Sequence, residues 1–213
     1  MSIVKTSLRM RLAPVLVLVA VVTAACGGSD AEPSAAPTTI ATAVAHQDAG
    51  HTRLDRLVGE WSVEKSTYVA GGTPDHPLVA HDTVSRWHWI TKTGNNFLQE
   101  EVDGTLGDKP YYRQGALGYS PTDDRYEWST VDSMTPMMMT YRGAKNSGSA
   151  ADIVMTGDFT DPGILGPANA GKTTPMRTVI RFESPDRTVM EIYFTPAGGA
   201  EVLADRVVLT RRS

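Results

Sequence analysis

The sequence predicts an all-β fold: a closed antiparallel barrel of about ten strands with a short N-terminal capping helix. Three observations support this prediction. From Trp61 onward, β-rich segments of roughly eight to twelve residues recur between turn signals. Apolar residues alternate with polar ones along these segments, which gives each strand one apolar face. Short links make neighbouring strands antiparallel, and closing such a sheet into a barrel removes both of its edges.

The chain begins with the features of a cleaved export signal. Lys5, Arg9 and Arg11 precede an apolar run over residues 12–22, which is too short for a stable membrane anchor. Small residues follow the run. We therefore expect a lipoprotein signal peptide over residues 1–25.

The only cysteine of the chain follows this signal. Thr23-Ala24-Ala25-Cys26 resembles the lipobox of bacterial lipoproteins, which implies that Cys26 becomes the lipidated first residue. An ordinary signal peptide with an incidental cysteine is the alternative. A lipid on Cys26 would attach the protein to a membrane, at the outer face of the bacterial cytoplasmic membrane or in the periplasmic envelope. Residues 26–48 are then a flexible linker, because they are rich in Ala, Pro, Ser and Thr.

The folded domain is expected over residues 49–213 and to begin with a helix. Leu54, Leu57 and Val58 have helical spacing within residues 51–58, and Gly59 suits the helix end. This helix is short, so we expect it to cap one end of the barrel.

Ten strands follow, separated by turn-prone sequences such as Asn95-Asn96, Asp123-Asp124 and Gly198-Gly199. Two longer connections, 70–80 and 161–173, are rich in Gly and Pro and are expected to form flaps over the open end. The predicted strands are 61–68, 82–92, 96–106, 110–119, 125–132, 136–143, 152–159, 174–183, 187–195 and 201–211.

Alternation assigns side chains to the two faces of each strand. In the last strand, Leu203, Val207 and Leu209 share a face with Asp205 and Arg211. The other apolar faces consist of Trp87 with Trp89; Tyr126 and Trp128 with Asp132; Met137 and Met139 with Tyr141; and Met190, Ile192 and Phe194.

A set of short motifs resembles the uncharacterised bacterial family DUF1579. The set covers nearly all of residues 51–212 and consists of Leu57-Val58-Gly59-Glu60-Trp61, Gly94-Asn95-Asn96-Phe97-Leu98, Gly118-Tyr119-Ser120-Pro121, Trp128 to Met134, Gly157-Asp158-Phe159 and Leu209-Thr210-Arg211. That family is grouped with the calycins, the lipocalin-like barrels. The resemblance implies structural roles for Gly59 and Trp61, and for Arg211 packing across the tryptophan.

Several classes of function find no support in the sequence. The net charge is −4 and the 20 Lys and Arg residues are scattered, which argues against nucleic-acid binding. No nucleophile motif occurs. Met134, Met137, Met138 and Met139 could ligate Cu(I), but filling an irregular core is the favoured interpretation. His88 is expected to face away from the lumen unless a bulge inverts its strand. No metal site and no cofactor is predicted.

Polar residues on the inward faces are the remaining candidates for chemistry. Glu100, Arg113, Asp132 and Asp205 are expected inside, either as ion pairs or as the polar groups of a ligand pocket. The predicted ligand-binding residues are Trp87, Trp89, Arg113, Tyr126, Trp128, Met137, Met139 and Tyr141.

The favoured hypothesis is an envelope protein that binds a small apolar or amphipathic ligand in the lumen. The alternatives are an enzyme that uses Asp132 or Glu100 as general acid or base, and a protein-interaction module with a solid barrel. The sequence identifies no protein partner.

Overall fold

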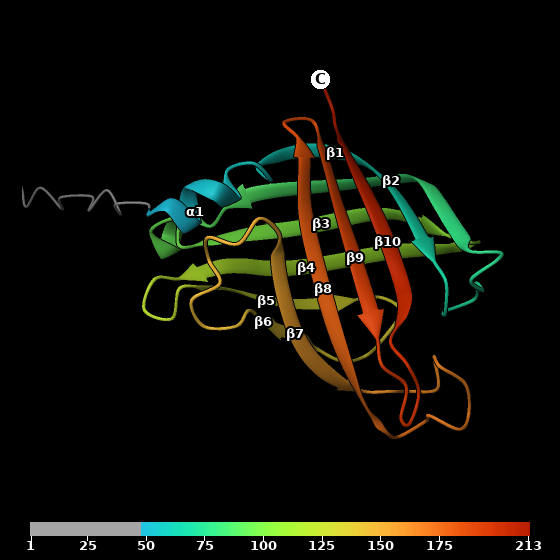
Figure 1. Cartoon of the computed structure of the whole chain (residues 1–213). Coiled ribbons are helices and arrows are strands. Elements are labelled where there is room, and N and C mark those ends of the chain that lie inside the picture. The colour runs from blue at the N-terminus through green and yellow to red at the C-terminus, as the bar shows by residue number, and fades with distance from the viewer. Residues whose placement is uncertain (1–47) are drawn as a thin grey trace, which may run out of the picture. The chain divides into compact units, whose positions relative to one another are not determined.

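Ten antiparallel strands close into one barrel in a computed structural model that describes residues 48–213 (Figure 1). The predicted signal peptide, Cys26 and all but the last residue of the predicted linker lie outside the described residues. The elements are α1 (Ala49–Leu54), β1 (Gly59–Thr67), β2 (Leu78–Trp89), η1 (Thr91–Thr93), β3 (Phe97–Leu106), β4 (Lys109–Ser120), β5 (Arg125–Asp132), β6 (Met139–Arg142), β7 (Ile153–Thr160), β8 (Thr173–Ser184), β9 (Arg187–Phe194) and β10 (Val202–Arg211).

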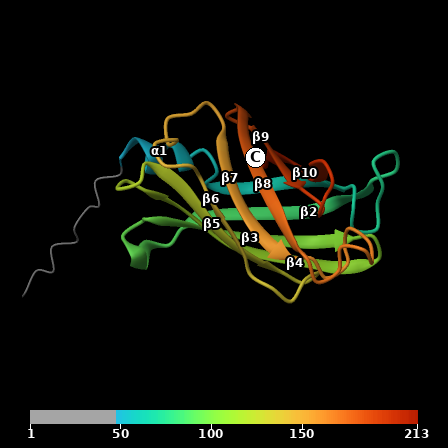
Figure 2. The same ribbon diagram turned by 60° about the horizontal axis from the view of Figure 1, so that its bottom comes forward.

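The strands follow one another around the barrel in chain order, and β1 pairs with β10 to close it. That closing ladder runs from Trp61 opposite Arg211 to Thr67 opposite Asp205. The structure therefore confirms the predicted all-β closed barrel. Strands β2–β5 and strands β7–β10 form two walls that face each other (Figure 2).

Period-two alternation determines which side chains enter the barrel. Along β1, Trp61, Val63, Lys65 and Thr67 are buried, whereas Ser62 is exposed. An apolar residue on the inner face of a strand is removed from water by the opposite wall, and this burial stabilises closure.

One predicted face is wrong. Leu203 was expected to share the inner face of the last strand with Asp205, but the pairing of β10 with β9 shifts register between these two residues. A bulge adds one residue to a strand and so reverses the faces on one side of it. Ala204 is fully buried there, and Leu203 is only half-buried and pairs with Tyr193 on the outer side.

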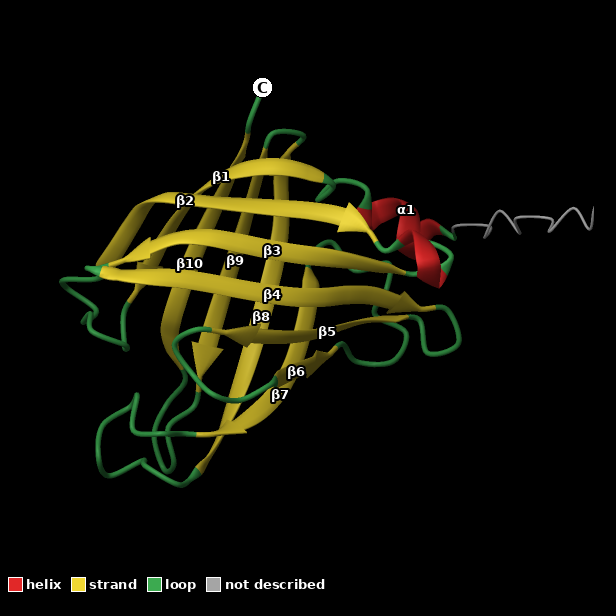
Figure 3. Cartoon of the chain, turned by 180° about the vertical axis from the view of Figure 1, so that it is seen from behind, coloured by secondary structure: helices red, strands yellow, loops and turns green. Residues whose placement is uncertain are grey.

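Helix α1 lies at the opposite end of the strands from the long connections (Figure 3). It begins earlier than predicted, because the Asp48 side chain accepts a hydrogen bond from the His51 backbone N–H at 3.0 Å. It ends at Leu54, short of the predicted Val58. Leu54 and Leu57 are fully buried, so the segment closes its end of the barrel.

Trp61 and Arg211 tie the first strand to the last at this closed end. The Arg211 guanidinium carbon is 4.1 Å from the centroid of the Trp61 ring. Arg211 also donates to the carbonyls of Val58 at 2.7 Å and Arg56 at 2.9 Å. The Trp61 indole N–H donates to the Leu57 carbonyl at 2.7 Å. Every polar group of this cluster therefore has a partner.

The other end is covered by the connections 68–77 and 161–172 and by residues 133–138. Asp161 is fully buried, and its carboxylate accepts backbone N–H groups of Gly163 at 2.8 Å and Ile164 at 2.7 Å. This carboxylate fixes the shape of its connection. Strand β6 spans Met139–Arg142 instead of the predicted 136–143, because residues 133–138 turn across the barrel end.

Candidate functional site

Two ion pairs lie on the inner face of the barrel, each between two neighbouring strands. Arg113 Nε lies 3.3 Å from Glu100 Oε2, and Lys65 Nζ lies 2.9 Å from Asp205 Oδ1. Thr67 also donates its hydroxyl to Asp205 Oδ1 at 2.7 Å. Because these residues occupy inward positions on β1, β3, β4 and β10, alternation brings two positive and two negative charges into the barrel.

Burial and ion pairing shift the pKa values of these charged groups in opposite directions. Burial raises the pKa of Glu100, and the opposing effect of Arg113 does not cancel it. For Lys65, burial is the largest single effect and would lower the pKa, but the charge and hydrogen bond of Asp205 together with Tyr111 outweigh it, and the pKa is raised. Lys65 therefore stays charged at neutral pH, which makes it a cation rather than a nucleophile.

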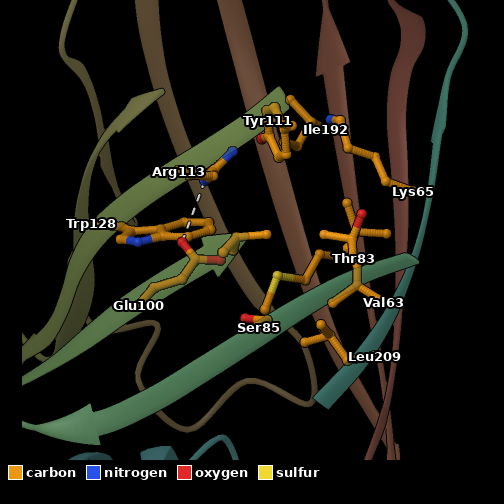
Figure 4. Close-up of a pocket in the computed structure, with 13 residues that line it drawn as sticks. Val63, Lys65, Thr83, Ser85, Glu100, Tyr111, Arg113, Trp128, Ile192 and Leu209 are labelled. Carbon is orange, nitrogen blue, oxygen red and sulfur yellow. Dashed lines mark hydrogen bonds and ion pairs between the residues drawn. The ribbon is translucent and has the colours of Figure 1, made fainter. Parts of the chain in front are cut away.

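An inner chamber lies between this polar layer and the closed end (Figure 4). It encloses about 430 Å³ of space free of protein atoms, counting the part open to solvent. We define it by the residues that line it: Val63, Lys65, Thr83, Ser85, Glu100, Val102, Tyr111, Arg113, Trp128, Met190, Ile192, Val207 and Leu209.

The two walls of the inner chamber differ in chemistry. Its polar side chains all come from the first five strands, whereas β9 and β10 contribute only Met190, Ile192, Val207 and Leu209. A molecule in the chamber would therefore meet an apolar surface on one side and hydrogen-bonding groups on the other.

Four residues that line the inner chamber have a buried polar atom without a hydrogen-bond partner among the described residues. These atoms are Thr83 Oγ1, Ser85 Oγ, Arg113 Nη2 and Trp128 Nε1. The Thr83 and Ser85 residues are 2% and 0% exposed, so bulk water does not satisfy them. An unsatisfied buried polar group costs about 1–3 kcal/mol, which makes four around one chamber a feature to explain.

An outer chamber lies on the other side of the polar layer, toward the flaps. It encloses about 580 Å³ of atom-free space, again counting the part open to solvent. It shares Lys65, Tyr111, Arg113 and Ile192 with the inner chamber. The remaining lining residues are Thr67, Val69, Ala70, Leu106, Asp132, Met134, Thr135, Met139, Tyr141, Ile164, Phe194 and Asp205. The four shared residues therefore form a constriction between the chambers.

The predicted ligand-binding residues do not form a single site. Arg113 and Trp128 line the inner chamber, and Met139 and Tyr141 line the outer one. Trp87 is buried with its ring centroid 6.1 Å from that of Trp128. Trp87 therefore packs beside the inner chamber and does not line it.

Two of the predicted residues lie at the helix end instead. Trp89 donates its indole N–H to Asp55 at 2.8 Å, and Tyr126 donates its hydroxyl to the Gly50 carbonyl at 3.3 Å. Met137 is half-buried in the turn that precedes β6 and packs against the core. These three residues line neither chamber, so the structure does not bring them together with Arg113 and Trp128.

The two candidate carboxylates occupy different settings. Glu100 is buried and paired with Arg113. Asp132 lines the outer chamber without an ion pair among the described residues, but its Oδ1 accepts the backbone N–H groups of Met134 at 2.8 Å and Thr135 at 2.9 Å. Asp132 therefore organises the turn after β5 through Oδ1, whereas Glu100 is held by its ion pair with Arg113.

Sequence reasoning missed Lys65, Thr83, Ser85 and Tyr111. A signal for Lys65 was present, because it continues the inward alternation of Trp61 and Val63. Thr83 and Ser85 likewise alternate with Trp87 along β2. Polar residues on an inner face carry the same period as apolar ones, and that period identifies them.

Other features of the described residues bear on metals and membranes. No group of three or more His, Cys, Asp and Glu side chains in residues 48–213 is arranged to hold a metal ion. Within the same residues, none of the helices has the length and apolar character that crossing a membrane requires. His88 is exposed on the outer face, and Met138 is 67% exposed.

Comparisons with known proteins identify a family. Residues 46–211 match the family described as "Protein of unknown function (DUF1579)". No curated protein matches the chain. Among solved structures, a redesigned β-barrel named mFAP0, bound to DFHBI, is 13% identical with a TM-score of 0.38; the match covers 73% of this chain and 99% of that one. A second, EF1p2_mFAP2b bound to DFHBI, is 11% identical with a TM-score of 0.39 and coverage of 77% and 100%.

Proposed function

The chain belongs to the DUF1579 family, whose description assigns no activity, and from the lumen geometry we propose that the barrel binds a small molecule with an apolar body. One observation carries this proposal. The inner chamber keeps unfilled space beside buried polar groups that have no partner within residues 48–213, namely Thr83 Oγ1, Ser85 Oγ, Arg113 Nη2 and Trp128 Nε1.

Apolar residues at positions 83 and 85 would remove the cost of two unsatisfied hydroxyls and would fill the space. A bound molecule achieves both effects at once, because its body fills the chamber against Met190 and Leu209 and its polar atoms meet the hydroxyls.

The proposed route into the inner chamber runs through the outer chamber. The two chambers adjoin at the residues that line both of them, which are Lys65, Tyr111, Arg113 and Ile192. The flap residues Val69, Ala70 and Ile164 line the outer chamber. We therefore assign entry to the flap end, because α1 closes the other.

Native mass spectrometry tests this function. Residues 46–213 include the whole closed sheet with its own core, so they serve as the test protein. After incubation with a lipid extract and with medium-chain ketones and alcohols, we expect a retained ligand that the Ser85→Leu variant loses, because leucine fills the inner chamber. Ser62→Leu, on the outer face of β1, is the matched control and keeps the ligand. Retention that is equal in both variants would contradict binding in the inner chamber.

We also propose that the protein is a lipid-anchored component of the bacterial cell envelope. Thr23-Ala24-Ala25-Cys26 supports this assignment by its resemblance to a lipobox. The mass of the mature protein from a bacterial host is the test. A diacylglycerol-modified N-terminal Cys26 is expected, and it disappears in Cys26→Ser. A mature chain that begins elsewhere would contradict the anchor.

A further inference from the structure

We propose that the inner chamber selects neutral molecules that carry a hydrogen-bond-accepting oxygen, such as a ketone, ester or amide carbonyl, over carboxylates. The proposal rests on the proposed ligand-binding function and specifies the ligand class of the same site. Its basis is the combination of Arg113 Nη2 as an unused buried donor and a charge balance that is already complete.

The unpartnered groups require an acceptor from the ligand. A guanidinium nitrogen can only donate, and Arg113 Nη2 has no partner among the described residues. The hydroxyls of Ser85 and Thr83 can donate as well, from inward positions two residues apart on β2. A single carbonyl oxygen with its two lone pairs can accept from Arg113 and from one of these hydroxyls, so an uncharged ligand suffices.

The existing charges disfavour an added anion. Glu100 lies against Arg113 and Asp205 against Lys65, so with both carboxylates ionised the buried layer has two positive and two negative groups. A carboxylate would bring a third negative charge into a site with no third cation, and an uncompensated buried charge is strongly destabilising. A carbonyl group adds no net charge.

The geometry of Arg113 supports the same selection. Arginine holds a carboxylate best through two parallel N–H groups, but Glu100 already occupies Nε at 3.3 Å. A ligand carboxylate that used the Nε edge would have to displace Glu100, which is fixed to β3 and only 5% exposed. A carbonyl oxygen needs only Nη2.

A matched pair of probes tests this selection on residues 46–213 at pH 8. Nonan-2-one and nonanoate have chains of equal carbon number and differ in charge, and titration calorimetry measures the affinity of each. We expect the ketone to bind at least about tenfold more tightly, the equivalent of about 1.4 kcal/mol.

Removing one buried negative charge should change the preference of the inner chamber for the ketone over nonanoate. In Glu100→Gln the lumen gains a net positive charge, so nonanoate is expected to bind at least about tenfold more tightly than it binds the wild type, and the preference for the ketone shrinks or reverses. Glu101→Gln is the matched control, because it makes the same charge change at the next position of β3, which faces out, and it keeps the wild-type preference. If Glu100→Gln does not fold, Asp205→Asn makes the same change at the second ion pair.

The outcomes separate the two proposals. If the wild type binds nonanoate as tightly as the ketone, or if Glu101→Gln changes the preference as much as Glu100→Gln does, the selection for neutral acceptors is overturned and ligand binding stands. If neither probe binds and the lipid extract leaves no ligand on the protein, the proposed function fails and the selection fails with it.

Discussion

The Trp61–Arg211 contact at the closed end and the inner chamber differ in whether their buried polar groups have hydrogen-bond partners. At the closed end, the Trp61 indole donates to the Leu57 carbonyl, and Arg211 donates to the carbonyls of Val58 and Arg56. In the inner chamber, Ser85 Oγ and Arg113 Nη2 have no partner among the described residues. The first arrangement stabilises the fold, whereas the second costs stability. This difference supports the proposed binding of a ligand in the lumen.

The largest expected effect is at the closed end. Trp61→Ala removes a fully buried indole that packs under Arg211, and we expect a loss of about 3–5 kcal/mol in the free energy of unfolding. Urea denaturation measures it. Trp89→Ala is the control, because Trp89 is only half-buried and should cost less. An equal or smaller loss for Trp61→Ala would mean that closure does not depend on this contact.

Two threonines of the lumen differ in the same way, because the hydroxyl of one has a hydrogen-bond partner and that of the other has none among the described residues. Thr67 donates to the Asp205 carboxylate at 2.7 Å, so Thr67→Val should cost about 1.5–3 kcal/mol of stability. Thr83 Oγ1 has no partner among the described residues, so the same substitution there should leave stability unchanged or raise it by up to about 1 kcal/mol. Thermal unfolding of both variants measures these two changes in stability. A substantial loss in Thr83→Val would indicate that the hydroxyl is satisfied and would weaken the case for a ligand.

The pH dependence of stability should reveal the Lys65 ion pair, with a smaller effect. The pKa of Lys65 is raised above its ordinary value of 10.5 in the folded state, so above that pH the folded protein binds more protons than the unfolded chain. Stability from this pair is fully present below pH 10.5 and is lost as the pH rises through the folded pKa. Lys65→Met should lack this component of the alkaline decline in urea titrations. A decline identical in both proteins would show that the pair contributes nothing.

Much of the fold could be predicted from the sequence, because alternation and turn chemistry are local signals. The ten strands and the inward positions of Glu100 and Arg113 follow from period-two patterns. The contact of Arg211 with Trp61 was implied by the family resemblance, and alternation chose Arg211 ahead of Arg212. The face of Leu203 could not be predicted, since a bulge depends on the pairing with the neighbouring strand.

The composition of the site was less predictable than the fold. Alternation gives the face of a residue but not its depth in the barrel, which depends on strand tilt and stagger. Trp89 and Tyr126 therefore reach the helix end, while Arg113 lies in the middle of the lumen. Lys65 was overlooked because charged residues are almost never fully buried unless they are paired, and its partner Asp205 is distant in sequence.

The closure by Arg211 also has a consequence for folding kinetics. Its hydrogen bond to the Val58 carbonyl joins residues 153 positions apart. Contacts of such long range are reached only after the entropy of a large loop has been lost, and barrels rich in them fold in about milliseconds to seconds rather than microseconds. The barrel therefore cannot complete its closing ladder before the last strand is available, and a chain that lacks its final few residues should remain open along the seam between β1 and β10.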